Sequence, residues 1–139
     1  MKNAAIEFVF VYGTLQSQFN NYWSRFLRQH SVYVSKGKCS GRLYHIAHYP
    51  GAVYDETSEK FIHGELYLTT KAPYLFQILD AYEQCTHNYP TPHEFAIKKI
   101  KVKVKYFSVE ANCYLFNRDT AAFPIIESGF YFSEYQSRY

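Results

Sequence analysis

The sequence predicts one domain of the α+β class, in which strands and two helices share a core. Its 139 residues are the usual length of a single domain, and such a domain buries about 68–70% of the surface that its unfolded chain exposes. Hydrophobic residues make up 47% of the chain and aromatic residues 20%, which excludes a disordered chain. Runs of β-branched and aromatic residues alternate with two segments of helical periodicity.

The first half of the chain is expected to consist mainly of strands. Residues 6–12 are a β-branched and aromatic run that stops at Gly13, the pattern of a strand buried on both faces. Residues 20–29 place apolar side chains on one helical face, with Asn20 or Asn21 available as N-cap, so this helix should cover a sheet face. Further strands are expected at residues 31–34, 42–46 and 61–68, separated by turns at 36–38, 49–51 and 55–60.

The second half is expected to hold one helix and a hairpin. Thr70 as N-cap and Pro73 in the first turn indicate a helix that ends near Cys85. Residues 89–92 contain two prolines and predict a loop. The remaining pattern predicts a long hairpin formed by residues 97–106 and 108–116.

The sequence also indicates the setting in which the chain works. Its longest apolar stretch, residues 8–12, is far shorter than the roughly 18–20 residues of a membrane-spanning helix. Glu7 precedes that stretch and no small-residue cleavage pattern follows, so no signal peptide is expected. The cysteines Cys39, Cys85 and Cys113 are odd in number and widely spaced, which favours buried, unreactive thiols in a reducing cytoplasm over a disulfide scaffold.

The histidines do not form a convincing metal site. His45 and His48 are three residues apart in an expected strand, so they should point to opposite faces. His87 and His93 flank the proline loop without an obvious further ligand. Ser17 lies in no G-x-S-x-G motif. We therefore expect no metal and no cofactor.

The lysines of the first hairpin strand share one face, at Lys99, Lys101, Lys103 and Lys105. Such a ribbon can bind single-stranded nucleic acid through phosphate contacts, or it can be a solvated face that discourages edge-to-edge strand pairing. The net charge of +3 and the pI of 8.7 favour the solvated face, because nucleic-acid-binding domains usually have a pI above about 9. Neither nucleic acid nor a membrane is expected as a partner.

Two features point to chemistry. The turn Tyr12-Gly13-Thr14-Leu15 follows the first buried strand, and Gly13 permits a conformation in which successive N–H groups converge on an anion. The alternative is an ordinary strand-to-loop turn. Glu83 is expected at the end of the second helix, beside the buried face, where the helix dipole and partial burial raise the pKa of a carboxyl and suit it to be a general base. Its alternative is a solvated glutamate.

Several short motifs follow one another along nearly the whole chain. They are FVYGTL at residues 10–15, Asn21, GRLY at 41–44, YPG at 49–51, GELY at 64–67 and LDAYE at 79–83, followed by Tyr114 and the Ser-Gly pair at 128–129. In this order they resemble the motifs of the gamma-glutamylcyclotransferase-like (AIG2-like) family. The resemblance implies a small, twisted, mixed β-barrel with flanking helices and a pocket at one barrel mouth.

The resemblance also implies a reaction and a set of site residues. Enzymes of this family cleave a γ-glutamyl amide by attack of its own α-amine on the γ-carbonyl, which yields 5-oxoproline and a free amine or amino acid. Glu83 matches the acid/base glutamate of the family, and Glu65 is expected to be structural. The substrate-binding residues would be Tyr12, Gly13, Thr14, Leu15 and Tyr114. A small γ-glutamyl molecule would then be the substrate of a monomer or homodimer.

The chain departs from the family pattern at four positions. Gln84 stands where glycine is usual and Gln16 where a basic residue is common. Phe95 and Ile97 replace a tyrosine and an arginine. These departures affect the amine side of the pocket, so two alternatives stay open: a homologue that binds a metabolite without turnover, and an interaction or nucleic-acid-binding barrel.

Overall fold

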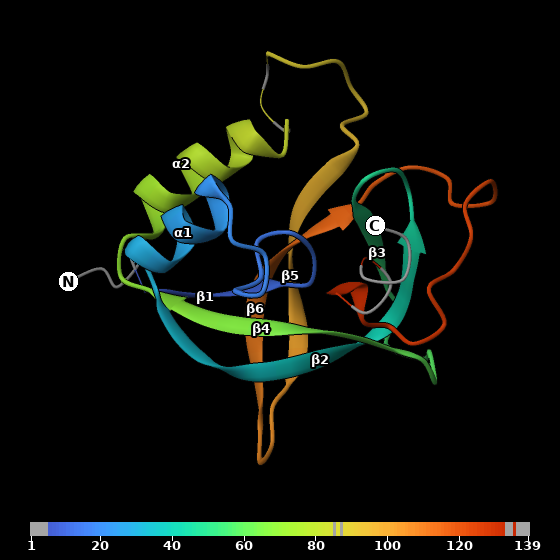
Figure 1. Cartoon of the computed structure of the whole chain (residues 1–139), viewed down its shortest axis with the longest axis horizontal. Coiled ribbons are helices and arrows are strands. Elements are labelled where there is room, and N and C mark those ends of the chain that lie inside the picture. The colour runs from blue at the N-terminus through green and yellow to red at the C-terminus, as the bar shows by residue number, and fades with distance from the viewer. Residues whose placement is uncertain (1–5, 85, 87, 133–134, 136–139) are drawn as a thin grey trace.

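The computed structural model describes residues 6–84, 86, 88–132 and 135. Cys85, where the second helix was expected to end, and the loop histidine His87 lie outside these residues. In chain order the elements are β1 (Glu7–Val11), α1 (Tyr22–Gln29), β2 (Val32–His45), β3 (Pro50–Tyr54), β4 (Phe61–Thr69), α2 (Ala72–Tyr82), β5 (Phe95–Lys103) and β6 (Ser108–Phe116). Figure 1 shows how they are arranged.

The described strands form a mixed β-barrel, as the resemblance implied. Their order is β3-β2-β4-β1-β6-β5, and a further pairing of β2 with β5 closes five of them into a ring, outside which β3 pairs with β2. The pairing of β1 with β6 is parallel and the other pairings are antiparallel. The barrel closes where Lys38 lies opposite Lys103. The mouth of this barrel is where a pocket can form between strand ends.

Strand β2 corrects the prediction of two short strands with a turn at residues 36–38. It runs without interruption from Val32 to His45. A side chain at Gly37 would place its Cβ 2.9 Å from Val102 Cγ1 and 3.3 Å from the Lys103 carbonyl oxygen. Gly37 is therefore present because β5 packs closely against β2 at the barrel closure.

Three further boundaries differ from the prediction. Residues 49–51 do not form a separate turn, because Pro50 and Gly51 begin β3, and proline is tolerated as the first residue of a strand. The N-cap of α2 is Lys71 and not Thr70; the Lys71 N–H donates to Thr69 Oγ1 at 3.0 Å. The first hairpin strand is β5, Phe95–Lys103, so Lys105 lies beyond it in the turn.

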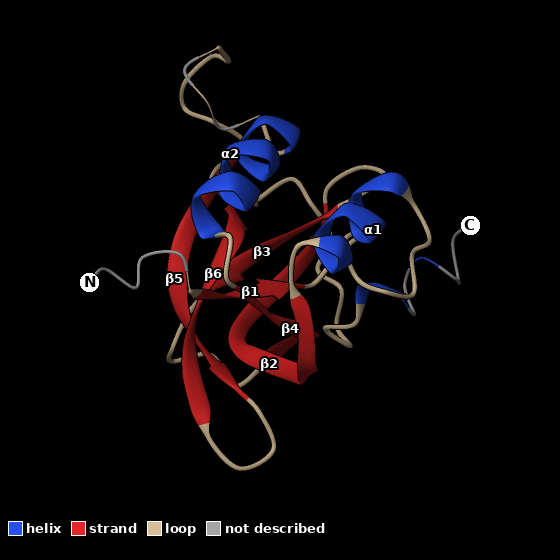
Figure 2. Cartoon of the chain, turned by 90° about the vertical axis from the view of Figure 1, so that its left-hand side faces the viewer, coloured by secondary structure: helices blue, strands red, loops and turns tan. Residues whose placement is uncertain are grey.

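Strand β1 is buried on both faces, as its sequence predicted. Phe10 and Tyr12 point into the barrel core, whereas Val9 and Val11 belong to a second core under the helices. Both helices lie over the same side of the barrel, next to β1 (Figures 1 and 2). Helix α1 begins with a capping box in which Asn21 Oδ1 accepts from the backbone N–H of Ser24.

The remaining features concern the outside of the barrel and the thiols. Lys99, Lys101 and Lys103 are exposed, and the ammonium groups of Lys38 and Lys103 lie 4.3 Å and 5.2 Å from the ring centre of Phe61. Two thiols, at Cys39 and Cys113, are buried and unpaired within the described chain. Of the helices that the structure describes, none has the length and apolar character needed to cross a membrane.

Candidate active site

A pocket of about 320 Å³ opens at one mouth of the barrel. Its walls come from the end of β1 and the loop after it, the start of β3, the end of α2, the start of β5, and β6. The pocket brings together the six site residues expected from the sequence: Tyr12, Gly13, Thr14, Leu15, Glu83 and Tyr114. It also contains lining residues that were not among the expected site residues: Phe10, Val11, Tyr49, Pro50, Tyr82, Gln84, Glu94 and Phe95.

The loop after β1 is held through its carbonyl groups. The backbone N–H of Gln16 donates to the Gly13 carbonyl at 3.1 Å, and Gln16 Nε2 donates to the carbonyls of Tyr12 at 2.8 Å and Gly13 at 3.2 Å. Asn21 Nδ2 donates to the Thr14 carbonyl at 2.9 Å. Among the described residues, no backbone carbonyl accepts a hydrogen bond from the N–H of Gly13, Thr14 or Leu15. These three N–H groups are the donors that the loop can offer to an anion.

The reason for glycine at Gly13 differs from the one expected. Gly13 does not adopt a positive φ, so left-handed backbone is not what the position requires. A Cβ at Gly13 would lie 3.1 Å from Pro50 Cγ and 3.3 Å from Pro50 Cδ. Glycine therefore lets the loop approach the start of β3, which forms another part of the pocket wall.

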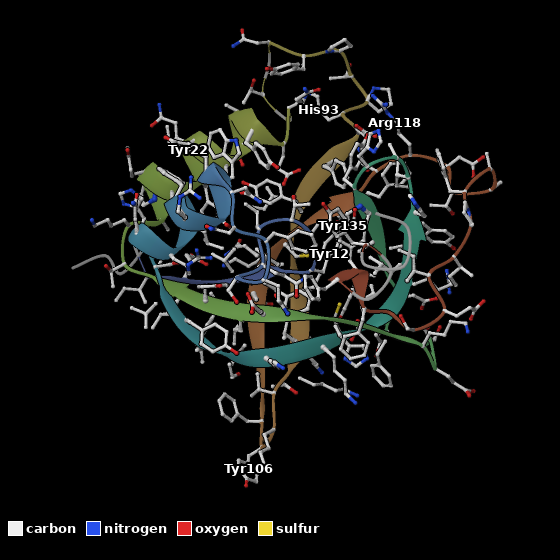
Figure 3. The ribbon with its side chains drawn as sticks, viewed as in Figure 1. Tyr12, Tyr22, His93, Tyr106, Arg118 and Tyr135 are labelled. Carbon is white, nitrogen blue, oxygen red and sulfur yellow. The ribbon has the colours of Figure 1, made fainter. Side chains whose placement is uncertain are left out.

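The hydroxyl of Tyr12 forms its hydrogen bonds with strands of the barrel. It donates to the Tyr114 carbonyl at 2.7 Å and accepts from the Ala52 N–H at 3.3 Å, so it joins β1 to β6 and β3. Tyr12 is buried in the interior, as Figure 3 shows. Burial raises the pKa of this phenol well above its ordinary value, and the hydroxyl stays neutral. Tyr12 can therefore offer the pocket its ring, while its hydroxyl acts as a structural link.

Glu83 has the electrostatic character expected of a general base. It is the C-cap residue of α2 and is partly buried at the pocket wall. Its pKa is raised from 4.5 to about 7, first by burial and then by the negative charges of Glu94 and Asp80. A carboxyl with this pKa can both accept and return a proton near neutral pH.

The end of α2 is fixed by a contact with the barrel. Tyr114 donates to Asp80, three residues before Glu83. Gln84, directly after Glu83, has φ of 59°, the left-handed conformation that commonly ends a helix and that glycine adopts most easily. The family glycine that Gln84 replaces thus coincides with a backbone position where glycine is preferred.

Another part of the pocket wall carries a second carboxylate, to which no role was assigned from the sequence. The hydroxyl of Tyr49 donates to Glu94 Oε2 at 2.5 Å, and Glu94 directly precedes β5. Burial and this hydrogen bond raise the pKa of Tyr49 to about 12. The YPG motif that begins at Tyr49 was one available signal, but Glu94 had none, because its partner is 45 residues away in the chain.

Glu65 has the structural role expected of it. Its carboxylate accepts from the Ser17 N–H at 2.7 Å, from Ser17 Oγ at 2.6 Å and from the Tyr67 hydroxyl at 3.0 Å. It is buried and does not line the pocket. Within the described ranges, no group of three or more His, Cys, Asp or Glu side chains could hold a metal ion.

Comparisons with known proteins agree with this architecture. The sequence pattern of the family "Gamma-glutamyl cyclotransferase, AIG2-like" matches residues 9–133. The sequence has no significant match among curated proteins.

Solved structures with the same fold include YkqA from Bacillus subtilis, with a TM-score of 0.69 and 24% identity over 90% of this chain. This chain corresponds to only 39% of YkqA. An AIG2-like protein from Mus musculus has a TM-score of 0.68 and 22% identity, covering 88% of this chain and 87% of that one. The protein ytfP from Escherichia coli has a TM-score of 0.60 and 28% identity, with coverages of 91% and 97%. Since the family pattern spans most of the sequence and the barrel is shared, the chain belongs to the gamma-glutamyl cyclotransferase, AIG2-like family.

Proposed function

We propose that the protein is a γ-glutamyl cyclotransferase that converts a γ-glutamyl amide into 5-oxoproline and a free amine. The observation that carries the proposal is the pairing, in one pocket, of Glu83 with a loop that offers backbone N–H donors. Glu83 has a pKa of about 7, so it is poised for proton transfer near neutral pH. The N–H groups of Gly13, Thr14 and Leu15 suit the α-carboxylate of the glutamyl group and the oxyanion that forms on its γ-carbon.

In this mechanism Glu83 accepts a proton from the α-ammonium group. The freed amine attacks the γ-carbonyl carbon, a C–N bond closes the five-membered ring, and the bond to the leaving nitrogen breaks as Glu83 returns its proton. The new ring nitrogen loses one further proton to the released amine. The four N–H hydrogens of the substrate thereby end as one on the ring and three on the released ammonium group.

The pocket has little more to supply, because the nucleophile is part of the substrate. Intramolecular reactions with good orientation reach effective molarities of about 10⁵–10⁸ M. Positioning by the loop and proton transfer by Glu83 therefore suffice without a serine, cysteine or metal nucleophile.

The test is a panel assay for 5-oxoproline with γ-glutamyl amines, γ-glutamyl amino acids and glutathione. Turnover of at least one donor, lost in the Glu83→Gln variant, is the expected result. Binding of a donor without 5-oxoproline release would instead support the alternative of a metabolite-binding homologue. If salt-sensitive binding to single-stranded nucleic acid is found, and is lost when Lys101 and Lys103 are neutralised, the barrel is an interaction module.

A further inference from the structure

One wall of the pocket neither binds the glutamyl group nor transfers a proton in the proposed reaction. It consists of Tyr49, Glu94 and Phe95. Glu94 is fixed at both ends, since its side chain accepts from the Tyr49 hydroxyl at 2.5 Å and its carbonyl accepts from the Asn117 N–H at 2.7 Å. A charged side chain held in this way contacts a ligand at low entropic cost.

The charge of the pocket is negative. Its described lining residues include the carboxylates of Glu83 and Glu94 and no lysine, arginine or histidine. The arginine whose charge acts on Tyr49 is Arg118, which lies beside His93 near the start of β5 (Figure 3) and donates to the Pro92 carbonyl at 3.2 Å. Arg118 is not part of the described lining, so it does not neutralise the wall from within the pocket.

The contacts proposed for the glutamyl half indicate which part of a substrate would meet this wall. If the backbone N–H groups of residues 13–15 hold the α-carboxylate and Glu83 meets the α-ammonium group, the glutamyl half is accounted for. What remains is the group on the far side of the γ-amide nitrogen. Phe95 is buried beside Glu94, where it offers an apolar surface next to the carboxylate. An alkyl chain that ends in a cation matches this pair of surfaces, whereas a carboxylate there would face Glu94 without compensation.

We infer that Glu94, held by Tyr49, makes the pocket selective for γ-glutamyl amides whose leaving amine carries a second, positively charged amino group. The substrate class is then a γ-glutamyl diamine, and leaving groups that carry a carboxylate are disfavoured. This inference rests on the proposed cyclotransferase function and adds the choice of leaving amine. Glu94 acts on selectivity and takes no proton in the reaction.

Three donors that differ only at the end of the leaving group provide the test: the γ-glutamyl amides of cadaverine, pentylamine and 6-aminohexanoate. The measurement is kcat/KM for 5-oxoproline release. For the unmodified protein, the cadaverine amide should exceed the aminohexanoate amide by at least about tenfold, with the pentylamide between them. Raising the salt concentration from 0.05 M to 0.5 M should shrink this ratio, because the selection is electrostatic.

The variants Glu94→Gln and Tyr49→Phe measure the contribution of each residue to this selectivity. In Glu94→Gln the ratio of cadaverine amide to aminohexanoate amide should approach one, and in Tyr49→Phe it should fall partway. Comparing ratios cancels any common change in the chemical step at Glu83. Glu110→Gln removes the same charge from an exposed position on β6, outside this pocket, and should keep the ratio of the unmodified protein.

The outcomes distinguish a failure of the selectivity inference from a failure of the proposed cyclotransferase function. Turnover of the donors with a ratio that neither salt nor Glu94→Gln changes would overturn the selectivity inference and leave the cyclotransferase intact. An absence of 5-oxoproline from all three donors and from the wider panel would overturn the cyclotransferase itself. If Glu94→Gln does not fold, the Tyr49→Phe ratio and the salt dependence of the unmodified protein decide the question.

Discussion

The hydroxyl of Tyr114 in β6 lies 2.5 Å from Oδ1 of Asp80 in α2 and donates a hydrogen bond to it. Asp80 is about one helical turn before Glu83, so this bond connects the end of α2 to the barrel wall. The carbonyl of Tyr114 accepts from Tyr12, which leads on to β1. Tyr114 thereby sets the position of the carboxylate that we propose as the general base.

Replacing Tyr114 with phenylalanine should lower both activity and stability. The change leaves the Asp80 carboxylate without this donor and should cost about 1–3 kcal/mol in the free energy of unfolding. Because the end of α2 loses its link, kcat/KM should fall about tenfold, which corresponds to 1.4 kcal/mol. Tyr106→Phe is the matched control, since Tyr106 is 83% exposed at the hairpin tip. Unchanged kcat/KM in a destabilised Tyr114→Phe protein would show that the link does not position Glu83.

Replacing Glu83 with glutamine should abolish 5-oxoproline formation yet stabilise the fold at alkaline pH. In the folded protein the pKa of Glu83 rises from 4.5 to about 7, so the folded state binds this proton more tightly than the unfolded state. The ionised carboxylate therefore costs stability above about pH 7, and this cost fades as the pH falls from 7 toward 4.5.

Urea denaturation at pH 8 and pH 4 measures this effect. Glu83→Gln should raise the free energy of unfolding by about 1–3 kcal/mol at pH 8 and by little at pH 4. Glu59→Gln, in an exposed turn, controls for the loss of one negative charge. An equal gain at both pH values would contradict the burial of a charged Glu83 as the cause.

The pH dependence of activity should depend on Glu94. With the γ-glutamyl pentylamide as donor, kcat/KM should decrease below a midpoint near pH 7, because Glu83 must be ionised to accept a proton. The charge of Glu94 is one cause of the raised pKa, after burial. Glu94→Gln should therefore move the midpoint of this decrease in kcat/KM, the acid limb of the pH profile, to lower pH. Glu110→Gln should leave this midpoint unchanged. A limb that stays near pH 7 in Glu94→Gln would mean that Glu94 does not act on Glu83.

Replacing Gln84 with glycine should stabilise the protein. Gln84 has φ of 59°, where a side chain costs roughly 1–2 kcal/mol and glycine costs little. The greater freedom of glycine in the unfolded chain offsets part of the gain, which leaves about 0.5–1 kcal/mol. Ala81→Gly, within α2, should change the free energy of unfolding by a similar amount in the opposite direction. If Gln84→Gly and Ala81→Gly shifted the denaturant midpoint in the same direction, the left-handed conformation of Gln84 would not explain the effect.

Replacing Gln16 with alanine should weaken substrate binding. The buried amide of Gln16 donates to the carbonyls of Tyr12 and Gly13, and its loss frees the loop that presents the backbone N–H groups. We expect KM to rise about tenfold with a smaller change in kcat, and the free energy of unfolding to fall by about 1–3 kcal/mol. Gln18→Ala, exposed in the same loop, should change neither. A fall in kcat at constant KM would place Gln16 in the chemical step instead of the loop.

Local sequence patterns predicted a helix or strand correctly where the residues of that element alone indicate its surroundings. Strand β6 has the bounds that its sequence predicted, and the Asn21 cap and apolar face of α1 predicted that helix. These patterns failed at Gly37, where the glycine predicted a turn. Gly37 instead lies inside β2, at a position where β5 packs closely against that strand. A contact between two distant segments cannot be inferred from the sequence of either segment alone.

The same distinction applies to the pocket. The loop after β1 and Glu83 each belong to a recognisable local motif, and the structure places both in one pocket. Glu94 belongs to no motif, and only the folding of the chain brings it to Tyr49. Gln16 was noted as a departure from the family, and its burial under the loop explains its role in holding the carbonyl groups.

The hydrogen bond from Tyr12 to Tyr114 spans 102 positions of the chain. During synthesis on a ribosome, β1 emerges first but cannot acquire its parallel neighbour until β6 has been made. The nascent chain must therefore carry β1, whose two faces are both apolar, without its final partner through most of translation. Pocket assembly is then among the last steps of folding, and a ribosome-bound chain that ends before β6 lacks both Tyr114 and a completed pocket.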